Sequence, residues 1–270
     1  MGKLKALSAV SSSPAESFVY VPPPSAFEAV RILVKPNLGY PAPPPVTVGL
    51  PVLGAVLRGL RRANPHARIV VVEGVTSSVS ADSIFKSSGL LDLLDGEMRA
   101  VDAEALNMVE FENIHPTPVR FPTMTAPAYV KEYDCRISVS AFKRTVLNDK
   151  PLISASLKNL YGLFPRERYK ARSPKSRGQL HRPSVGAVLQ DVYFSVGRYF
   201  DGAVVDLTQK YVNDSWEPDA GEAVDVGRVV WGDDLLAVDE AACHLAGEPV
   251  ADYIAPIRAI RERLQKAGDA

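Results

Sequence analysis

The hydrophobic and polar positions of the chain predict buried strands that alternate with amphipathic helices. Three runs rich in β-branched residues, VRILVKPN (30–37), RIVVVEG (68–74) and DCRISVSAF (134–142), are typical of strands buried on both faces. Residues 47–65 lie between the first two runs and repeat their hydrophobic positions at helical spacing. A strand, a helix and a second strand in this order predict a parallel βαβ unit.

The start of this first helix carries local signals of its own. Thr47 is the expected N-cap, and Pro51 falls in the first turn, where a helix tolerates proline. The preceding residues, 39–47, hold four prolines and therefore predict a loop over the strand ends. A second helix is expected after the second strand, with Ser80 as its cap and Gly89 near its end.

The second half of the chain continues the alternation. Residues 183–200 and 235–245 predict helices, 202–208 a strand, and 255–270 an amphipathic helix at the C-terminus. These elements predict an α/β fold: a mostly parallel or mixed sheet flanked by helices, of the doubly wound type, with a proline-rich insertion or small lobe.

The domain organisation follows from the same pattern. Residues 1–25 are expected to be a flexible N-terminal segment, and 26–265 a single α/β domain. Within this domain, the proline-punctuated residues 108–130 predict an inserted lobe, and 166–182 a basic loop. Residues 266–270 are expected to be a polar tail.

Composition narrows the functional classes. Thirty-one basic and 31 acidic residues balance, so the overall charge lacks the excess of a dedicated nucleic-acid binder, and nucleic acid is an unlikely partner. Cys135 and Cys243 are the two cysteines and lack CxxC spacing, which indicates a reducing, cytoplasmic setting. No apolar run approaches the length of a membrane span, so no membrane partner is expected.

Polar residues at strand ends are the first candidates for chemistry. In open α/β sheets, ligands bind outside the carboxyl ends of the strands. Lys35 and Asn37 lie at the carboxyl end of the first predicted strand, Glu73 ends the second, Lys143 follows the strand at 134–142, and Asp206 lies near the end of a later one. If the strand order brings them together, they form a site of mixed charge.

The segment LKNLYG adds a lysine in apolar surroundings. Lys158 and Asn159 lie among Leu157, Leu160 and neighbouring hydrophobic residues. A buried ammonium must extend to solvent, pair with a carboxylate or face an anion-binding pocket. The pocket is the favoured interpretation, and a lysine that extends to solvent from beneath a helix is the alternative. His181 could transfer a proton near neutral pH, or could simply be a structural loop histidine.

Several segments together resemble the prokaryotic domain-of-unknown-function family 362. They are ILVKPN, the helix opened by Thr47, VVVEG, SVSAFK, SLKNLYGLFP, VVDL and DDLLAVDEAACHLAG, and they cover most of residues 30–247. The family typically shows a KPN turn, a lysine after a central strand, an LKNLxG helix, a later histidine and an aspartate before an AVD-like helix. The resemblance implies functional roles for Lys35, Asn37, Lys143, Lys158, Asn159, Gly162, His181, Asp206 and Asp239.

The sequence also departs from its relatives. Some of them are described as iron–sulfur proteins because they carry a ferredoxin-like module with cysteine clusters, and no such clusters occur in the present sequence. Many relatives have a histidine shortly after the strand-end lysine, where this chain has Arg144 and Thr145. The resemblance therefore implies neither the redox role of the ferredoxin-like module nor the acid–base role of that histidine for this chain.

The basic loop allows three interpretations. Residues 166–182 hold seven Arg or Lys against one Glu, with Tyr169 among them. They could contact a polyanion, form a solvated mobile loop, or close as a lid over an anion near Lys158.

These observations favour an enzyme, or an enzyme-like pocket, for a small anionic metabolite such as a carboxylate or phosphate. The residues expected to carry chemistry are Lys143, Lys158 and His181. Those expected to bind substrate are Lys35, Asn37, Asn159 and Asp206. No metal site is expected, because the carboxylates lack a metal-binding spacing, and the sequence assigns no cofactor. The alternative is an accessory protein that docks a separate iron–sulfur protein through residues 166–182.

Overall fold

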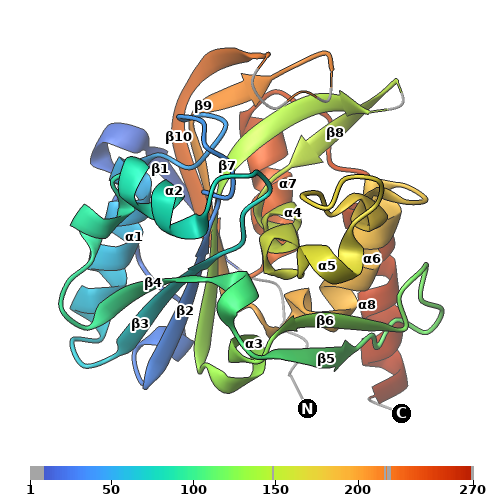
Figure 1. Cartoon of the computed structure of the whole chain (residues 1–270), viewed down its shortest axis with the longest axis horizontal. Helices are drawn as coiled ribbons and strands as arrows, with labels where there is room; N and C mark the ends of the chain where they lie inside the picture. Colours follow the sequence, from blue (N-terminus) through green and yellow to red (C-terminus); the bar gives the residue numbers. More distant parts are fainter. Residues whose placement is uncertain (1–8, 148, 216, 218–219, 269–270) are drawn as a thin grey trace.

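The computed structural model describes residues 9–147, 149–215, 217 and 220–268, and its centre is a mixed sheet of eight strands. The strand order is β1-β10-β9-β7-β2-β3-β4, with β8 paired to the far end of β7 (Figure 1). Neighbouring strands from β9 to β4 are parallel, whereas β10, β1 and β8 pair antiparallel. The predicted fold class, a mostly parallel or mixed sheet flanked by helices, is confirmed.

The strands of this sheet have the following bounds: β1 Val10–Pro14, β2 Arg31–Pro36, β3 Arg68–Glu73, β4 Met98–Asp102, β7 Cys135–Leu147, β8 Lys150–Ser154, β9 Gly202–Val212 and β10 Glu222–Gly232. The α-helices are α1 Leu50–Ala63, α2 Ala81–Ser87, α3 Tyr129–Glu132, α4 Ser156–Asn159, α5 Arg166–Tyr169, α6 Val185–Ser195, α7 Leu235–Leu245 and α8 Ile254–Gly268. Short 3-10 turns are η1 Ala15–Ser17, η2 Pro24–Ala26, η3 Leu90–Leu93, η4 Ala103–Ala105, η5 Leu160–Leu163, η6 Gly178–His181 and η7 Gly197–Tyr199.

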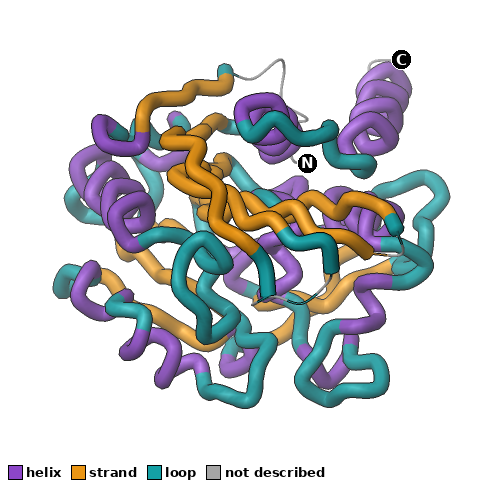
Figure 2. Tube along the Cα trace, turned by 90° about the horizontal axis from the view of Figure 1, so that it is seen from above, coloured by secondary structure: helices purple, strands orange, loops and turns teal. Residues whose placement is uncertain are grey.

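The two faces of the sheet pack against different helices. Side chains alternate along each strand, so Ile32 and Val34 of β2 join one hydrophobic cluster and Leu33 joins the other. The first cluster contains residues of α1 and α2, and the second contains residues of α4, α6, α7 and α8. Helices therefore lie on both sides of the strands, which is visible in Figures 1 and 2.

The expected N-cap of α1 is wrong. The helix begins at Leu50 with Gly49 as its N-cap, and the Thr47 hydroxyl instead donates to the Ala42 carbonyl at 2.8 Å. The Asp206 carboxylate accepts the Gly49 N–H at 2.9 Å and supplies the negative charge at this helix end. The local pattern could not predict this, because the capping group lies 157 residues further along the chain.

Strand β7 is longer than its hydrophobic run. Side chains from Cys135 to Phe142 are mostly buried, and from Lys143 onward they are half-buried. In this second part β7 pairs with β8 on one side and, at Lys143 and Arg144, still with β9 on the other. Lys143 therefore lies within β7. The sequence-based prediction that it follows the end of this strand is wrong. The strand projects beyond β2 and β3, so it forms a wall above their carboxyl ends.

The N-terminal region also differs from expectation. Of the segment predicted as flexible (1–25), residues 1–8 lie outside the described part of the chain, whereas β1 pairs with β10 along the edge of the sheet. Phe18 and Tyr20 are buried in the α1-side cluster, which holds this region against the domain. The serine-rich β1 lacks the alternation that would have predicted a strand.

The residues predicted as an inserted lobe, 108–130, form a two-stranded antiparallel sheet of β5 (Met108–Glu112) and β6 (Thr123–Pro127), followed by α3. Phe111 and Met124 are fully buried in the α6-side cluster, so this hairpin covers the core.

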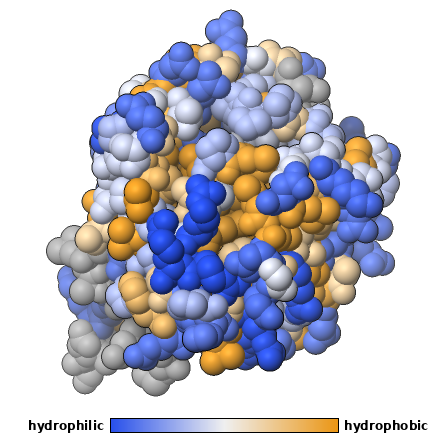
Figure 3. All heavy atoms as spheres, turned by 90° about the vertical axis from the view of Figure 1, so that its left-hand side faces the viewer, coloured by the Kyte–Doolittle hydropathy of each residue, from blue (hydrophilic) through white to orange (hydrophobic). Residues whose placement is uncertain are grey.

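On the surface over α1, hydrophobic side chains gather near the middle and are interrupted by hydrophilic ones (Figure 3). Among the described residues, no helix combines the length and the apolar character needed to span a bilayer.

Candidate functional site

A cleft of about 640 Å³ lies above the carboxyl ends of β2 and β3, beside the projecting part of β7. Its walls come from five separate parts of the chain, around residues 35–46, 73–76, 140–143, 154–162 and 176–181, with Glu217 at its margin. The polar residues that line it are Lys35, Asn37, Tyr40, Glu73, Thr76, Ser140, Lys143, Ser154, Lys158, Asn159, Tyr161, Ser176, Arg177, His181 and Glu217.

Lys35 forms the floor of the cleft and is paired with a carboxylate. Its ammonium donates to Glu73 Oε1 at 2.5 Å, to the Pro36 carbonyl at 2.7 Å and to Asn159 Oδ1 at 3.2 Å. Glu73 also accepts the N–H groups of Leu38 and Gly74. Burial lowers the pKa of Lys35, an effect that the charge of Glu73 opposes. These three acceptors use all three N–H groups of a charged lysine. Because they belong to β2, β3 and α4, the buried pair holds the ends of these elements together.

Asn159 ties the floor to the neighbouring strand. Its amide nitrogen donates to the Lys35 carbonyl at 2.8 Å and to Ser138 Oγ at 3.0 Å, while its oxygen accepts from the Lys35 ammonium. Asn159 thus connects α4 to both β2 and β7. Its donors and its acceptor are used within the protein, which assigns it a structural part in the cleft.

Helix α4, which carries Lys158 and Asn159, is held from α7. Asp239 accepts the N–H of Ser156 at 2.8 Å, the N–H of Leu157 at 3.1 Å and the Tyr253 hydroxyl at 2.7 Å. Burial raises the pKa of this aspartate, although its hydrogen bonds oppose the effect. Asp239 therefore positions the LKN segment without lining the cleft itself.

Close backbone contacts fix the roof. A Cβ on Gly162 would lie 2.5 Å from Glu73 Oε1 and 2.7 Å from Lys35 Nζ, so only glycine fits over the ion pair. The Arg177 guanidinium, 3% exposed, donates to the carbonyls of Phe164, Val75 (3.0 Å) and Gly162 (3.2 Å). Burial lowers the pKa of Arg177 to about 10. This arginine joins the segments that carry residues 75 and 162–164.

Lys143 enters the cleft from β7. Its ammonium donates to the Val46 carbonyl at 2.9 Å and to Asn37 Oδ1 at 3.3 Å, and no carboxylate of the described residues forms an ion pair with it. Burial, together with the charge of Lys158, lowers the pKa of Lys143 to about 7, and the charge of Glu73 opposes this effect only in part. A substantial fraction of Lys143 is therefore a neutral amine near neutral pH.

Lys158 faces the same space. Its nitrogen lies 5.5 Å from the centre of the Tyr161 ring, and it forms neither a hydrogen bond nor an ion pair with any residue that the structure describes. Burial lowers its pKa to about 8. A lysine that is partly desolvated, supported by a ring face and otherwise unpaired is suited to bind an anion.

His181 completes the polar wall. Its ring packs edge-on against Tyr161 at 5.6 Å, and Nδ1 lies 3.3 Å from the Arg177 carbonyl, which assigns the ring proton to Nδ1. Burial and the charge of Lys158 lower its pKa to about 4. His181 is thus neutral at pH 7, and Nε2 keeps a lone pair that can accept a proton.

The predicted site residues separate into groups. Lys35, Asn37, Lys143, Lys158, Asn159 and His181 line one cleft, although they come from distant parts of the chain. Asp206 is not among the lining residues, because its carboxylate accepts from Gly49 and Thr208.

The sequence gives little sign of three further lining residues: Arg177, Tyr161 and Ser140. Arg177 stands in a loop that looks solvated because of its Arg, Lys and Ser content. Ser140 is buried, and its hydroxyl finds no hydrogen-bond partner among the described residues.

The basic loop is partly built into the domain. Arg166 forms a two-pronged ion pair with Glu104, and Arg177 is buried beside it. The exposed basic residues of this loop are Arg168, Lys170, Arg172, Lys175 and Arg182. The loop is therefore partly packed into the domain and partly exposed to solvent.

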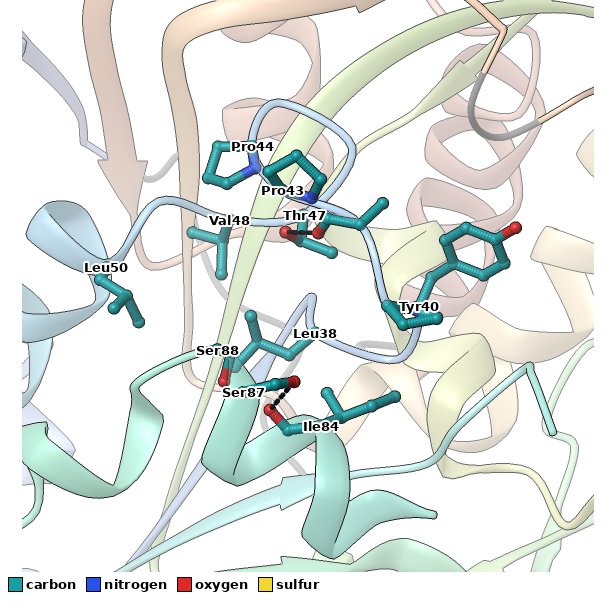
Figure 4. A pocket seen from close by; sticks show the side chains of 12 residues that line it. Leu38, Tyr40, Pro43, Pro44, Thr47, Val48, Leu50, Ile84, Ser87 and Ser88 are labelled. Atoms are coloured by element: carbon teal, nitrogen blue, oxygen red, sulfur yellow. Dashed lines mark hydrogen bonds between the residues drawn. The ribbon is translucent and has the colours of Figure 1, made fainter. Parts of the chain in front are cut away.

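A second cavity, of about 400 Å³, lies on the other side of the loop that follows β2 (Figure 4). Leu38, Pro43, Val48 and Ile84 make it largely apolar, and the Ser87 hydroxyl donates to the Ile84 carbonyl. Tyr40 lines both cavities.

Cys135 and Cys243 are buried and do not form a disulfide. Within the described part of the chain, no cluster of three or more His, Cys, Asp or Glu side chains is arranged to hold a metal ion.

The fold is that of a mixed α/β protein, and a partly desolvated cleft lined by Lys35, Lys143 and Lys158 lies at its strand ends. The model of a family described as Domain of unknown function (DUF362) matches residues 32–244, and the chain belongs to this family. The membership expected from the sequence motifs is confirmed.

The chain was also compared with curated proteins and with solved structures. No curated protein matches the chain. Among solved structures, it is similar to the lactate racemase apoprotein from Thermoanaerobacterium thermosaccharolyticum, with 14% identity and a TM-score of 0.46. The alignment covers 74% of this chain and 47% of that protein, so the chain spans about half of its length.

Proposed function

We propose that the protein is an enzyme, or an enzyme-like binding protein, for a small anionic metabolite that carries a carboxylate or phosphate group. The metabolite binds in the cleft at the strand ends, with its negative charge near Lys158 and Lys143. A reducing, cytoplasmic setting fits this proposal, because both cysteines are buried and do not form a disulfide.

One observation carries the proposal: the cleft has more cationic groups than its own carboxylates neutralise. Lys35 has Glu73 as its partner, whereas Lys143 and Lys158 form no ion pair with any described residue. Leaving two partly buried lysines without a counter-ion is costly, and the cost is recovered when an anion binds. The surplus positive charge therefore supports an anionic ligand.

Each polar group has a part in this proposal. Lys158 binds the anionic group of the metabolite, and Lys143 acts on the metabolite atom next to that group. The neutral imidazole of His181 accepts or returns a proton. Asn37 holds Lys143 in place through its side-chain oxygen. Lys35 and Asn159 maintain the shape of the floor, and Asp206 orients the helix that follows the loop over the cleft.

A thermal-shift screen of wild type, Lys143→Met and Lys158→Met against carboxylates, phosphates and nucleotides tests the proposal. A ligand at a hundred times its dissociation constant adds about 2.7 kcal/mol, enough for a shift of several degrees. We expect one anion class to stabilise wild type and the control Lys86→Met, an exposed α2 residue, but to have little effect on the cleft variants. Equal stabilisation of all four proteins would contradict an anion site at these lysines.

The exposed basic residues at 168–182 favour a second candidate, docking of an acidic partner such as an iron–sulfur protein. Five solvent-exposed cations would make such docking steeply dependent on salt, whereas an anion in a partly closed cleft is screened less. Binding to an acidic iron–sulfur protein should therefore weaken strongly with salt and disappear when Arg172 and Lys175 are changed to Glu. Salt-insensitive binding, or none, would reject this candidate.

A further inference from the structure

Two lysines of the cleft, Lys35 and Lys143, differ in the number of hydrogen-bond acceptors around them. Lys35 has three acceptors, one of them a carboxylate, and each N–H of its ammonium is used. Lys143 has two acceptors, the Val46 carbonyl and Asn37 Oδ1, and both are uncharged. A neutral amine has two N–H groups and one lone pair. The surroundings of Lys143 therefore satisfy the neutral form and leave its lone pair free.

The position of Lys143 makes that lone pair available. Lys143 lines a cleft of about 640 Å³, which has room for a small metabolite. Burial and, to a smaller extent, the charge of Lys158 disfavour protonation of Lys143 and lower its pKa to about 7. A lysine that is desolvated and lies near a second cation has the properties of an amine nucleophile.

Resting on the proposed function, we infer that Lys143 forms a reversible imine with the carbonyl carbon of a small oxo acid, whose carboxylate binds Lys158. Lys158 suits the carboxylate because it has no hydrogen-bond partner of its own in the described part of the chain. The substrate class thus becomes narrower: an acid that carries a ketone or aldehyde near its carboxylate.

The step balances without an oxidant or a reductant. The Lys143 lone pair attacks the carbonyl carbon, the C=O pair moves to oxygen, and a proton from nitrogen is transferred to that oxygen. The resulting carbinolamine loses its hydroxyl with a second nitrogen proton as water, and a C=N bond forms. The neutral Nε2 of His181, which lines the same cleft, is placed to carry these protons.

Reductive trapping tests the inference on the intact chain. Wild type is incubated near neutral pH with pyruvate, 2-oxoglutarate or acetoacetate, reduced with cyanoborohydride, and analysed by intact mass and peptide mapping. A reduced imine adds the mass of the acid less one oxygen atom. At pH 7, a lysine with a pKa of about 7 has on the order of a thousandfold more neutral amine than an ordinary lysine. We expect labelling of Lys143 to exceed that of exposed Lys86 by at least about tenfold.

Variants separate the inference from the proposed function. Lys143→Arg keeps the charge and should lose the adduct, Lys158→Met should reduce it by weakening carboxylate binding, and Lys86→Arg should leave it unchanged. If oxo acids raise the wild-type melting temperature but no adduct forms on Lys143, the imine is rejected and the anion site stands. If no adduct forms and no carboxylate, phosphate or nucleotide of the thermal-shift screen stabilises wild type, the proposed function is rejected as well.

Two other outcomes also overturn the inference. An adduct on Lys158 instead of Lys143 would contradict the assignment of the nucleophile. Equal labelling of Lys143 and Lys86 would show that the reaction is that of any surface lysine. Because the peptide map is made on wild type, this result does not depend on how well the variants fold.

Discussion

At the scale of single residues, the partners of each lysine decide its part in the cleft. Lys35 meets a carboxylate and two further acceptors, so its charge is compensated within the fold. Lys143 and Lys158 meet no carboxylate among the described residues, so their charge is available to a ligand. The same residue type therefore stabilises the protein in one position and opposes folding in the other two.

This contrast predicts different stability costs for two similar substitutions. Lys35→Met should lower the free energy of unfolding by about 3–5 kcal/mol, because it leaves the Glu73 carboxylate buried without its counter-ion. Lys143→Met should change it by no more than about 1 kcal/mol, because the lost hydrogen bonds are offset by removal of a buried cation. Urea denaturation measures both. Adding Glu73→Gln to Lys35→Met should recover part of the loss, and equal costs for both lysines would refute this account.

The lowered pKa of Lys143 predicts how stability depends on pH. In the folded state Lys143 loses its proton near pH 7, whereas in the unfolded chain it does so near about 10.4. Between these values the unfolded state binds more protons, so wild type gains stability as pH rises, by at most about 1.4 kcal/mol per pH unit for this group. Below pH 7 the cost of burying the charge is fully present.

The difference between wild type and Lys143→Met isolates this effect, because the other groups that act on Lys143, namely Lys158, Glu73 and Lys35, are present in both proteins. Urea denaturation at several pH values on either side of 7 should show wild type gaining on the variant as pH increases. Parallel stability curves for the two proteins would mean that Lys143 titrates normally.

At the scale of elements, the sequence predicts the frame of the cleft better than its contacts. The hydrophobic runs at 30–37, 68–74 and 134–142 correspond to β2, β3 and the buried part of β7, because burial on both faces leaves a clear pattern. The capping of α1 by Asp206 and of α4 by Asp239 joins residues far apart in the chain. No local pattern reveals such pairs, so sequence alone cannot separate a binding aspartate from a capping one.

The approach of η5 to the strand ends gives a prediction at this scale. Gly162→Ala should lower the free energy of unfolding by about 1–3 kcal/mol, because its Cβ would lie 2.5 Å from Glu73 Oε1 and force the roof away from the ion pair. Gly96→Ala is the matched control, since a Cβ there meets nothing within 4 Å. Its effect should be within about 0.5 kcal/mol. Urea denaturation decides, and similar losses in both variants would show that the contact at Gly162 is easily relieved.

At the scale of the whole molecule, the cleft is where separate parts of the chain converge. The projecting end of β7, the loops after β2 and β3, helix α4 and the turn at His181 each contribute one wall. Because the walls belong to different elements, a ligand that contacts all of them must dissociate before any one of these elements can open locally. An exposed docking surface would instead affect only residues 168–182.

Hydrogen exchange distinguishes these arrangements. With an anion at a hundred times its dissociation constant, amides that exchange only after ligand release should exchange about a hundredfold more slowly. We expect this protection around residues 37–48, 73–77, 156–163 and 176–181 together, since all contribute to the cleft. The last turn of α8 is distant in sequence from these segments, and because helix ends open locally we expect its exchange to be the same with and without the anion, so it serves as the internal control. Protection confined to 168–182 would instead place the ligand on the basic loop. Lys143 and Lys158 would then take no part in binding it.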